Sequence, residues 1–279
     1  MLRNIKNPPK KIYALGNKQL LASRCFAIVG ARNCTDYGRK MAIKFSSKLC
    51  EHDFCIVSGM AIGIDRFAHI GAMDVLGKTI AVLPSGLENV FPKENLDLFH
   101  NILNSGGLVI SEYEPKTEAN SKTFLERNRI VSGLSIGTLV VEGGRRSGSS
   151  VTAKLTKEQN KPVFCIPSSL ENSKGFMPND LIKKGAFLVT SINDILKRYP
   201  ENLYSKKKIR LKKVKRKRIF KASKFIETQY EKVYRAVPNY AIHINEILKK
   251  TKLDINEVSY KLMMLELEKK VVALPRTIF

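Results

Sequence analysis

The sequence has no run of eighteen apolar residues, the length that a helix needs to cross a membrane. Its first residues also lack the continuous apolar stretch and the small-residue cleavage site of a secretory signal. The five cysteines form neither a CxxC pair nor a cluster with histidine, and Cys25, Cys55 and Cys165 lie within apolar runs. We therefore expect a cytoplasmic protein without a membrane span, whose cysteines are free, buried thiols.

Acidic residues are scarce, because 25 Asp and Glu stand against 49 Lys and Arg, and the formal net charge is +24. Such an excess favours a polyanionic partner, with nucleic acid first and an anionic membrane surface second. A genome biased toward A and T would also raise the lysine content throughout the chain. Charge alone therefore does not decide between a nucleic-acid-binding protein and a protein that is merely rich in lysine.

Apolar runs alternate with helical patterns between residues 25 and 191. The runs are hydrophobic throughout, as expected for strands of a parallel sheet that is buried on both faces. Repeated strand–helix units of this kind predict an α/β fold with a Rossmann-like, doubly wound, mostly parallel sheet. The runs are CFAIVGAR (25–32), CIVSG (55–59), KTIAVLPSG (78–86), GLVISE (107–112), GTLVVEG (137–143), KPVFCIPS (161–168) and AFLVTS (186–191).

Composition divides the chain into four parts. Residues 1–24 are a lead-in segment, and residues 25–200 form the Rossmann-like domain. Residues 201–223 are a basic linker, in which eleven of the sixteen residues from 206 to 221 are Lys or Arg and none is acidic. Residues 224–279 show three helical stretches and an apolar end, which favours a small winged-helix-like α domain. A three-helix appendage for protein contacts is the alternative.

Ligands of doubly wound sheets bind beyond the carboxyl ends of the strands. Here those ends are rich in glycine and serine, which allow close backbone approach and offer N–H groups to an anion. Arg32 ends the first run, where binding of a phosphate is favoured over a salt bridge to a loop. Lys93 follows the third run. It could contact a phosphate or lie in solvent at the start of a helix, and the sequence favours neither. Residues 147–150 lead into a helix whose first N–H groups can hold an anion.

The stretch SGMAIGIDRFAH (58–69) allows two kinds of chemistry. Asp65 and His69 are four residues apart, so on a helix they share one face and could act as an acid/base pair. The sequence shows no nucleophile for them to serve. We therefore expect Asp65 to cap the helix and His69 to pack beneath it. The backbone N–H groups of residues 58–63 remain candidates for binding an anion.

Two arginines occur close together in FLERNRIVSGLS (124–135). Arg127 and Arg129 are two residues apart, so on a helix they point in different directions. One is expected to face the crevice at the strand ends and the other to make a structural bond, and the sequence does not say which. The stretch VGARNCTDYG (29–38) is not GxGxxG, and VVEGGRRSGSSVTA (140–153) lacks the GK[ST] ending of a P-loop, so these loops support neither dinucleotide binding nor hydrolysis by a P-loop.

Taken together and in this order, these loops resemble the DprA/Smf family of DNA-processing proteins. The resemblance rests on FAIVGAR, SGMAIGIDRFAH, FLERNRIVSGLS, VVEGGRRSGSSVTA and LIKKGA, and it spans about residues 7 to 191. The chain departs from the usual family pattern at Gly30-Ala31-Arg32, where GSR is usual. It also departs at residues 83–86, where LPSG replaces LGxG and Pro84 removes an N–H donor.

The resemblance implies a protein that binds single-stranded DNA without sequence preference, protects incoming strands and helps to load the RecA recombinase in DNA processing, recombination and natural transformation. It implies a homodimer, and neither catalysis nor a cofactor. It also implies that Arg32 and Lys93 line the DNA pocket and that glycine-rich loops contact phosphates through their backbone. The candidate DNA-binding residues are Gly30, Arg32, Ser58, Gly59, Gly63, Lys93, Arg127, Arg129, Ser147 and Gly148.

Two other classes of function compete with this one. The glycine-rich loops also resemble, more loosely, nucleotide phosphoribohydrolases, although residues 142–147 read EGGRRS where those enzymes have PGGxGT. The second alternative is a non-catalytic interaction adaptor, whose positive charge reflects only the composition of the genome.

The basic linker can be tested on its own. Deletion of residues 206–221 removes eleven positive charges, and each cation that neutralises a phosphate of a single strand adds about 0.7 to the salt slope of log affinity. We expect the deletion to flatten this slope for single-stranded DNA in anisotropy titrations at several salt concentrations. An identical slope would mean that these charges never touch the strand.

Overall fold

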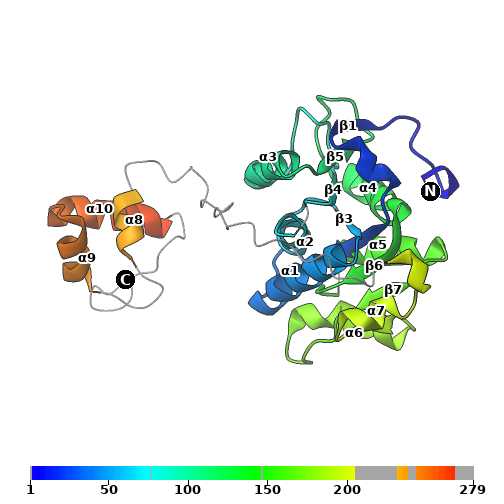
Figure 1. Cartoon of the computed structure of the whole chain (residues 1–279). Helices are drawn as coiled ribbons and strands as arrows, with labels where there is room; N and C mark the ends of the chain where they lie inside the picture. The colour runs from blue at the N-terminus through cyan, green and yellow to red at the C-terminus, as the bar shows by residue number, and fades with distance from the viewer. Residues whose placement is uncertain (1, 76, 146, 205–230, 238–242, 268–279) are drawn as a thin grey trace. The chain divides into compact units, whose positions relative to one another are not determined.

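The computed structural model describes residues 2–75, 77–145, 147–204, 231–237 and 243–267 (Figure 1). The chain divides into two compact units, Met1–Lys212 and Lys213–Phe279. Most of the predicted basic linker lies outside the described residues, and so does the apolar end of the chain.

The larger unit is built on one eight-stranded sheet. Its strands are β1 (Tyr13–Gly16), β2 (Cys25–Val29), β3 (Cys55–Ser58), β4 (Thr79–Val82), β5 (Leu108–Ser111), β6 (Ser135–Val140), β7 (Val163–Cys165) and β8 (Phe187–Leu188). Their order across the sheet is β1-β5-β4-β3-β2-β6-β7-β8, and every pair is parallel except β1 with β5. Strands β2 to β5 are buried along their whole length, as their continuous apolar runs predict.

Helices cover both faces of this sheet (Figure 1). They are α1 (Asp36–Glu51), α2 (Ile64–Met73), α3 (Leu96–Asn104), α4 (Ser121–Leu134), α5 (Ser149–Glu158), α6 (Phe176–Lys183) and α7 (Ile192–Leu196). Phe26 and Ile28 of β2 face α1, α2 and α7, and α3 packs on the same side against β4 and β5. Ala27 and Val29 face the opposite side with α4, α5 and α6. The predicted doubly wound α/β fold is thereby confirmed.

Strand β1 and helices α6 and α7 are elements that the sequence pattern did not indicate. The second half of β1 is exposed at the edge of the sheet, so its four residues carry no buried apolar run. Helix α7 has five residues, too few to show a helical period. Because β1 lies between residues 1 and 24, part of the lead-in segment belongs to the sheet.

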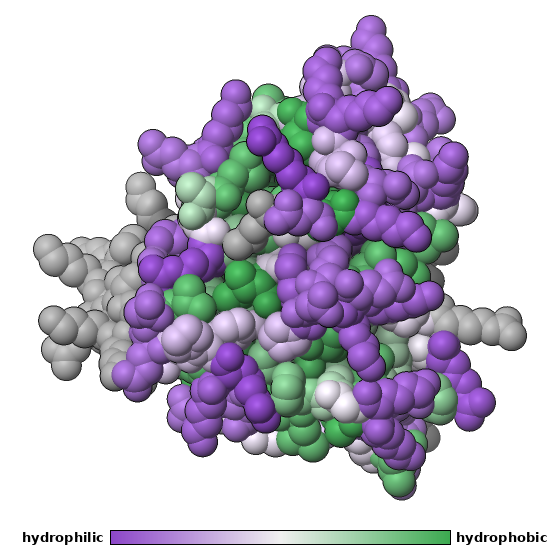
Figure 2. All heavy atoms as spheres, turned by 90° about the vertical axis from the view of Figure 1, so that its right-hand side faces the viewer, coloured by the Kyte–Doolittle hydropathy of each residue, from purple (hydrophilic) through white to green (hydrophobic). Residues whose placement is uncertain are grey.

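The expectations drawn from cysteine and from hydropathy can be compared with the structure directly. All five cysteines are free, and Cys25, Cys50, Cys55 and Cys165 are buried, as predicted, whereas Cys34 is only half-buried. In the part of the chain that the structure describes, no helix has the length and apolar character needed to cross a bilayer. The face shown in Figure 2 is mostly hydrophilic, with hydrophobic side chains in smaller areas between.

The second unit contains three described helices, α8 (Glu231–Ala236), α9 (Ile244–Thr251) and α10 (Ile255–Leu267). They pack around an apolar cluster that includes Val233, Ile247 and Leu262. The helical pattern of this region is thus confirmed within the described residues. The expected strand at 271–279 lies outside them, so the winged-helix assignment stays a prediction.

Glu142, directly after β6, is a buried carboxylate that joins three segments of the larger unit. Its side chain accepts hydrogen bonds from the Thr35 backbone N–H at 2.9 Å and from the Thr35 hydroxyl at 2.5 Å. Thr35 is the N-cap of α1, and the Glu142 carbonyl accepts from the Ala31 N–H at 2.8 Å. This one residue therefore fixes the end of β2 and the start of α1 against the end of β6.

We expect Glu142→Gln to destabilise the larger unit by about 1–3 kcal/mol, because each carboxylate oxygen accepts from one Thr35 donor and an amide nitrogen replaces one of these acceptors. Denaturant unfolding followed by circular dichroism measures this change. The matched control is Glu158→Gln on α5, where the carboxylate is exposed and pairs with Lys154 at 3.8 Å; its effect should stay within about 0.5 kcal/mol. Equal stability of the two variants would contradict the role given to Glu142.

Candidate functional site

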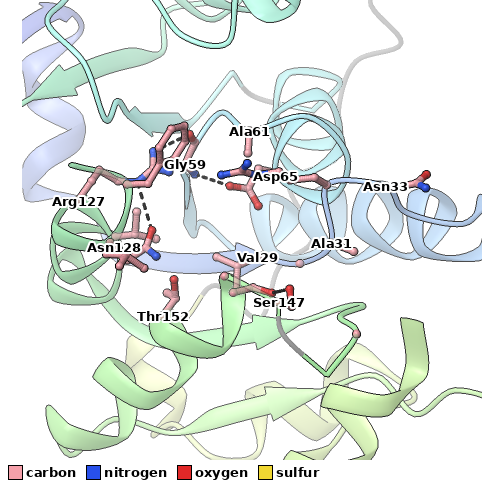
Figure 3. Close-up of a pocket in the computed structure, with 18 of the residues that line it drawn as sticks. Val29, Ala31, Asn33, Gly59, Ala61, Asp65, Arg127, Asn128, Ser147 and Thr152 are labelled. Carbon is pink, nitrogen blue, oxygen red and sulfur yellow. Dashed lines mark hydrogen bonds between the residues drawn. The ribbon is translucent and has the colours of Figure 1, made fainter. Parts of the chain in front are cut away.

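The strand order of the sheet reverses beside β2. The chain passes from β2 to β3 on one side and from β6 to β7 on the other, and ligand-binding crevices open at such reversals. A cleft of ≈ 810 Å³ lies there, walled by Val29 and Gly30 from the end of β2 (Figure 3). Phe124 and Arg127 of α4 and Thr152 of α5 line it as well. The cleft is therefore where the sheet topology predicts a site.

The side chain of Arg127 connects α4 to the sheet. Its side chain is only 3% exposed, and its guanidinium donates to the Gly59 carbonyl at 2.6 Å and to the Val82 carbonyl. Figure 3 shows the side chain reaching from α4 toward Gly59, with Asn128 beside it. The arginine thus ties the carboxyl ends of β3 and β4 to the helix that forms one wall of the cleft.

Asp65 is the acidic side chain of this region. It lies in the first turn of α2, is 7% exposed and accepts a hydrogen bond from the Gly59 N–H at 3.1 Å. Burial raises the pKa of Asp65, while the charge of nearby Arg127 acts in the opposite direction. The N-cap of α2 is Gly63, so the expected capping role is wrong in detail: Asp65 braces the loop before the helix.

His69 is packed beneath the cleft, as predicted. Its Nδ1 lies 2.7 Å from the Thr79 hydroxyl, and its Nε2 is buried without a partner among the described residues. Burial lowers the pKa of His69 to about 3, and the charge of Arg127 acts in the same direction. Burial also lowers the pKa of Arg127 to about 10. At neutral pH the imidazole is neutral and the guanidinium is charged, which suits structural roles for both.

The loop after β3 packs directly on the loop after β2. Gly63 has a φ of +82°, and a Cβ atom there would lie 2.2 Å from the Arg32 carbonyl oxygen. The N–H of Ile64 donates to the Ala31 carbonyl at 3.1 Å. Glycine is thus required at residue 63 both by the backbone angle and by the close approach, and the two loops form one continuous wall.

Arg32 is the exposed cation of that wall. Its guanidinium carbon lies 4.7 Å from the centre of the Phe124 ring, and both residues line the cleft. Arg32 has no ion-pair partner among the described residues, in contrast to the alternative of a salt bridge to a neighbouring loop. The arrangement presents a positive charge and an aromatic ring together at the mouth of the cleft.

Lys93 lies outside the lining of the cleft but next to its wall. It is exposed and begins a 3₁₀ turn, which is anchored by the Asn95 amide donating to the Met60 carbonyl at 2.8 Å. Phe91, two residues earlier, lies edge-on to Phe124 with 5.6 Å between ring centres. The segment that carries Lys93 is therefore held against both the loop after β3 and the aromatic wall.

The structure assigns different places to the two arginines that the sequence could not distinguish. Arg127 lines the cleft, although its Nη1 donates to two backbone carbonyls and its Nε to the Asn128 side-chain oxygen. Arg129 points elsewhere: it pairs with Glu112 at 2.6 Å and donates to the Asn7 carbonyl at 2.8 Å. Arg129 thereby fastens the lead-in segment to α4 and does not line the cleft.

The serine candidates also lie in different places. Ser58 is buried, donates its hydroxyl to the Ile28 carbonyl at 2.7 Å and does not line the cleft. Ser147 and Gly148 do line it, at the start of α5. The Ser147 and Ser149 hydroxyls are 2.7 Å apart, so this edge offers hydroxyl and backbone N–H groups to a ligand.

The lining residues that the sequence reasoning missed include Phe124, Asn128 and Lys174. Phe124 stands three residues before Arg127, so helical spacing alone could have placed it on the same face. Lys174 belongs to the loop after β7, in a stretch without a recognised motif, and no signal pointed to it.

Comparisons with known proteins agree with this geometry. A protein-family model described as DNA recombination-mediator protein A matches residues 1–200. DNA processing protein DprA of Bacillus subtilis is 38% identical over 201 residues, covering 72% of this chain and 67% of that protein. Protein Smf of Escherichia coli is 40% identical over 188 residues, covering 67% of this chain and 50% of that protein. The matched part thus spans between half and two thirds of these relatives.

Two solved structures are similar over the larger unit. DNA processing protein A from Streptococcus pneumoniae has a TM-score of 0.68 and 39% identity, covering 71% of this chain and 70% of that one. DNA processing protein A from Helicobacter pylori, described for its single-stranded DNA binding mode, has a TM-score of 0.65 and 35% identity. It covers 70% of this chain and 91% of that one.

We expect Gly59→Ala to displace the Arg127 side chain, because the new Cβ would lie 2.5 Å from one of its terminal nitrogens. Overpacking of this kind costs about 1–3 kcal/mol, which thermal or denaturant unfolding measures. Gly148→Ala is the matched control, since its backbone is helical and a Cβ there meets nothing within 4 Å. A Gly59→Ala variant as stable as the control would show that Arg127 has room to move.

Proposed function

Because the chain belongs to the DNA recombination-mediator protein A family, we propose that its cleft binds single-stranded DNA without sequence preference. This family comprises recombination mediators rather than enzymes, so the phosphoribohydrolase-like alternative has no support. The observation that carries the proposal is the exposed Arg32 stacked on Phe124 where the strand order reverses. The similar Helicobacter protein, described for its single-stranded DNA binding mode, supports the choice of ligand.

The chemistry of the cleft suits an unpaired strand. Such a strand offers unstacked bases to aromatic side chains and spaced phosphates to cations and N–H groups. Phe124 supplies a ring, Arg32 supplies a charge, and the start of α5 at Ser147 and Gly148 supplies polar groups on the opposite edge. These groups contact backbone and base faces rather than base edges, which is why the proposed binding does not depend on sequence.

The proposal extends to partners and to location. We place the protein in the cytoplasm, acting as a homodimer that protects incoming strands and helps to load the RecA recombinase. The description of the matching family as a recombination mediator supports this role. Relatives with the name DNA processing protein support a role in DNA processing. The adaptor alternative differs in one measurable respect, since it requires no binding of DNA.

We expect Arg32→Ala and Lys93→Ala each to weaken binding of single-stranded oligonucleotides about ten- to a hundredfold, since a charge-assisted hydrogen bond contributes about 1.5–3 kcal/mol. The loss should be the same for oligo-dT and for mixed sequences, because a phosphate contact carries no sequence information. Fluorescence anisotropy titration at two salt concentrations measures both effects, in the full chain and with residues 206–221 deleted.

Lys40→Ala on α1 is the charge-matched control, because Lys40 is exposed and does not line the cleft. It should bind as the wild type does. Wild-type affinity in both the Arg32→Ala variant and the Lys93→Ala variant, with the linker deleted, would refute the proposed site. Absence of binding by the wild type would favour the adaptor.

A further inference from the structure

A second groove of ≈ 580 Å³ lies beside the first cleft. Its walls come from the loop after β7, from the loop after β6 and from α6 along its length. Gly144 and Lys174 line both the groove and the cleft. The two hollows therefore meet along a shared edge, and a chain that leaves the cleft past Lys174 enters the groove.

The groove is built by main-chain hydrogen bonds. The Gly143 N–H donates to the Lys174 carbonyl at 2.6 Å, and the Met177 N–H donates to the Gly143 carbonyl at 2.9 Å. Gly143 directly follows Glu142, the residue that fixes the end of β6. The position of the groove relative to the cleft is thus set by the same strand end.

The groove combines an aromatic ring with cations. The Arg145 guanidinium carbon lies 4.5 Å from the centre of the Phe176 ring, and Phe176 is 42% exposed. Arg145, Lys174 and Lys183 have no ion-pair partner among the described residues. Asp180 also lines the groove, but its carboxylate is paired with Lys184 at 2.7 Å.

The pairing of Arg145 with Phe176 repeats the pairing of Arg32 with Phe124 in the cleft. In both places an arginine without an ion-pair partner among the described residues lies against a partly exposed ring. Phosphates and bases alternate along a single strand, so a second aromatic and cationic pair next to the first suits the following nucleotides of the same strand.

We propose that this groove is a second nucleotide subsite, occupied by the part of the single strand that continues beyond the cleft. A base stacks on Phe176 or on the Arg145 plane, and the neighbouring phosphates contact Arg145 and Lys183. Lys174 contacts the phosphate at the shared edge. This inference rests on the proposed function, because it assigns the path of the same ligand.

The test is a length series of oligo-dT, from three to twenty nucleotides, titrated by fluorescence anisotropy against the full chain. The groove variants are Arg145→Gln, in which an exposed side chain is changed, and Phe176→Leu, which keeps apolar volume but removes the ring. Lys157→Gln is the control, because Lys157 is exposed at the far end of α5 and lines neither hollow. Thermal unfolding verifies that each variant is folded.

We expect the wild type and the control to gain affinity as the oligonucleotide grows long enough to leave the cleft. The groove variants should bind the shortest oligonucleotides normally and lose about five- to a hundredfold on the longer ones, the range found for loss of a stacked base. Arg32→Ala should instead lose affinity at every length. These two patterns separate the groove from the cleft.

Groove variants that match the wild type at every length would overturn the subsite and leave the proposed function intact. A uniform loss of affinity at all lengths would also overturn it, because the groove would then not bind a separate part of the strand. A wild-type chain that binds no oligonucleotide would remove the proposed function, and the subsite with it.

Discussion

A buried guanidinium must find acceptors for its donors, and in this fold the acceptors of Arg127 are strand-end carbonyls. The side chain donates to Gly59 and Val82, at the ends of β3 and β4, while it belongs to α4. Leaving those groups unpaired in the interior would be costly. The wall of the cleft and the lack of a side chain at residue 59 both follow from this one placement.

Arg127 is buried, whereas Arg32 is exposed and available to a ligand. Arg127 donates to two strand-end carbonyls and Arg129 pairs with Glu112, and Glu142 holds the start of α1. Arg32 lies between Ala31 and Thr35, which both hydrogen-bond to Glu142, yet it has no ion-pair partner among the described residues. Binding costs less conformational entropy when the contacting group is already positioned. The buried polar network thus acts on a ligand through the exposed residue that it positions.

The sheet and the location of the cleft could be predicted because both follow from patterns that a sequence carries. Continuous apolar runs mark strands buried on both faces, and the order of such strands fixes where a crevice opens. The direction in which a side chain points cannot be predicted from such patterns. Arg127 and Arg129 have the same local sequence context, and only the packing of α4 decides which one reaches Gly59. Ser58 has the composition of an anion-binding loop but turns inward to Ile28. Lys174 reaches the cleft from a strand end that is far along the chain.

The distribution of charge bears on how a strand would be held. Of the net charge of +24, residues 206–221 carry +11 and the rest of the chain +13. The lining of the cleft contributes little to either part, because its charged side chains are Arg32, Arg127 and Lys174 with Asp65, and Arg127 is turned to the backbone. Long-range attraction to a polyanion is therefore a property of the whole chain, and salt screens it. Discrimination for an unpaired strand has to come from the ring of Phe124 and the shape of the cleft, because a duplex keeps its base faces stacked and unavailable to a ring.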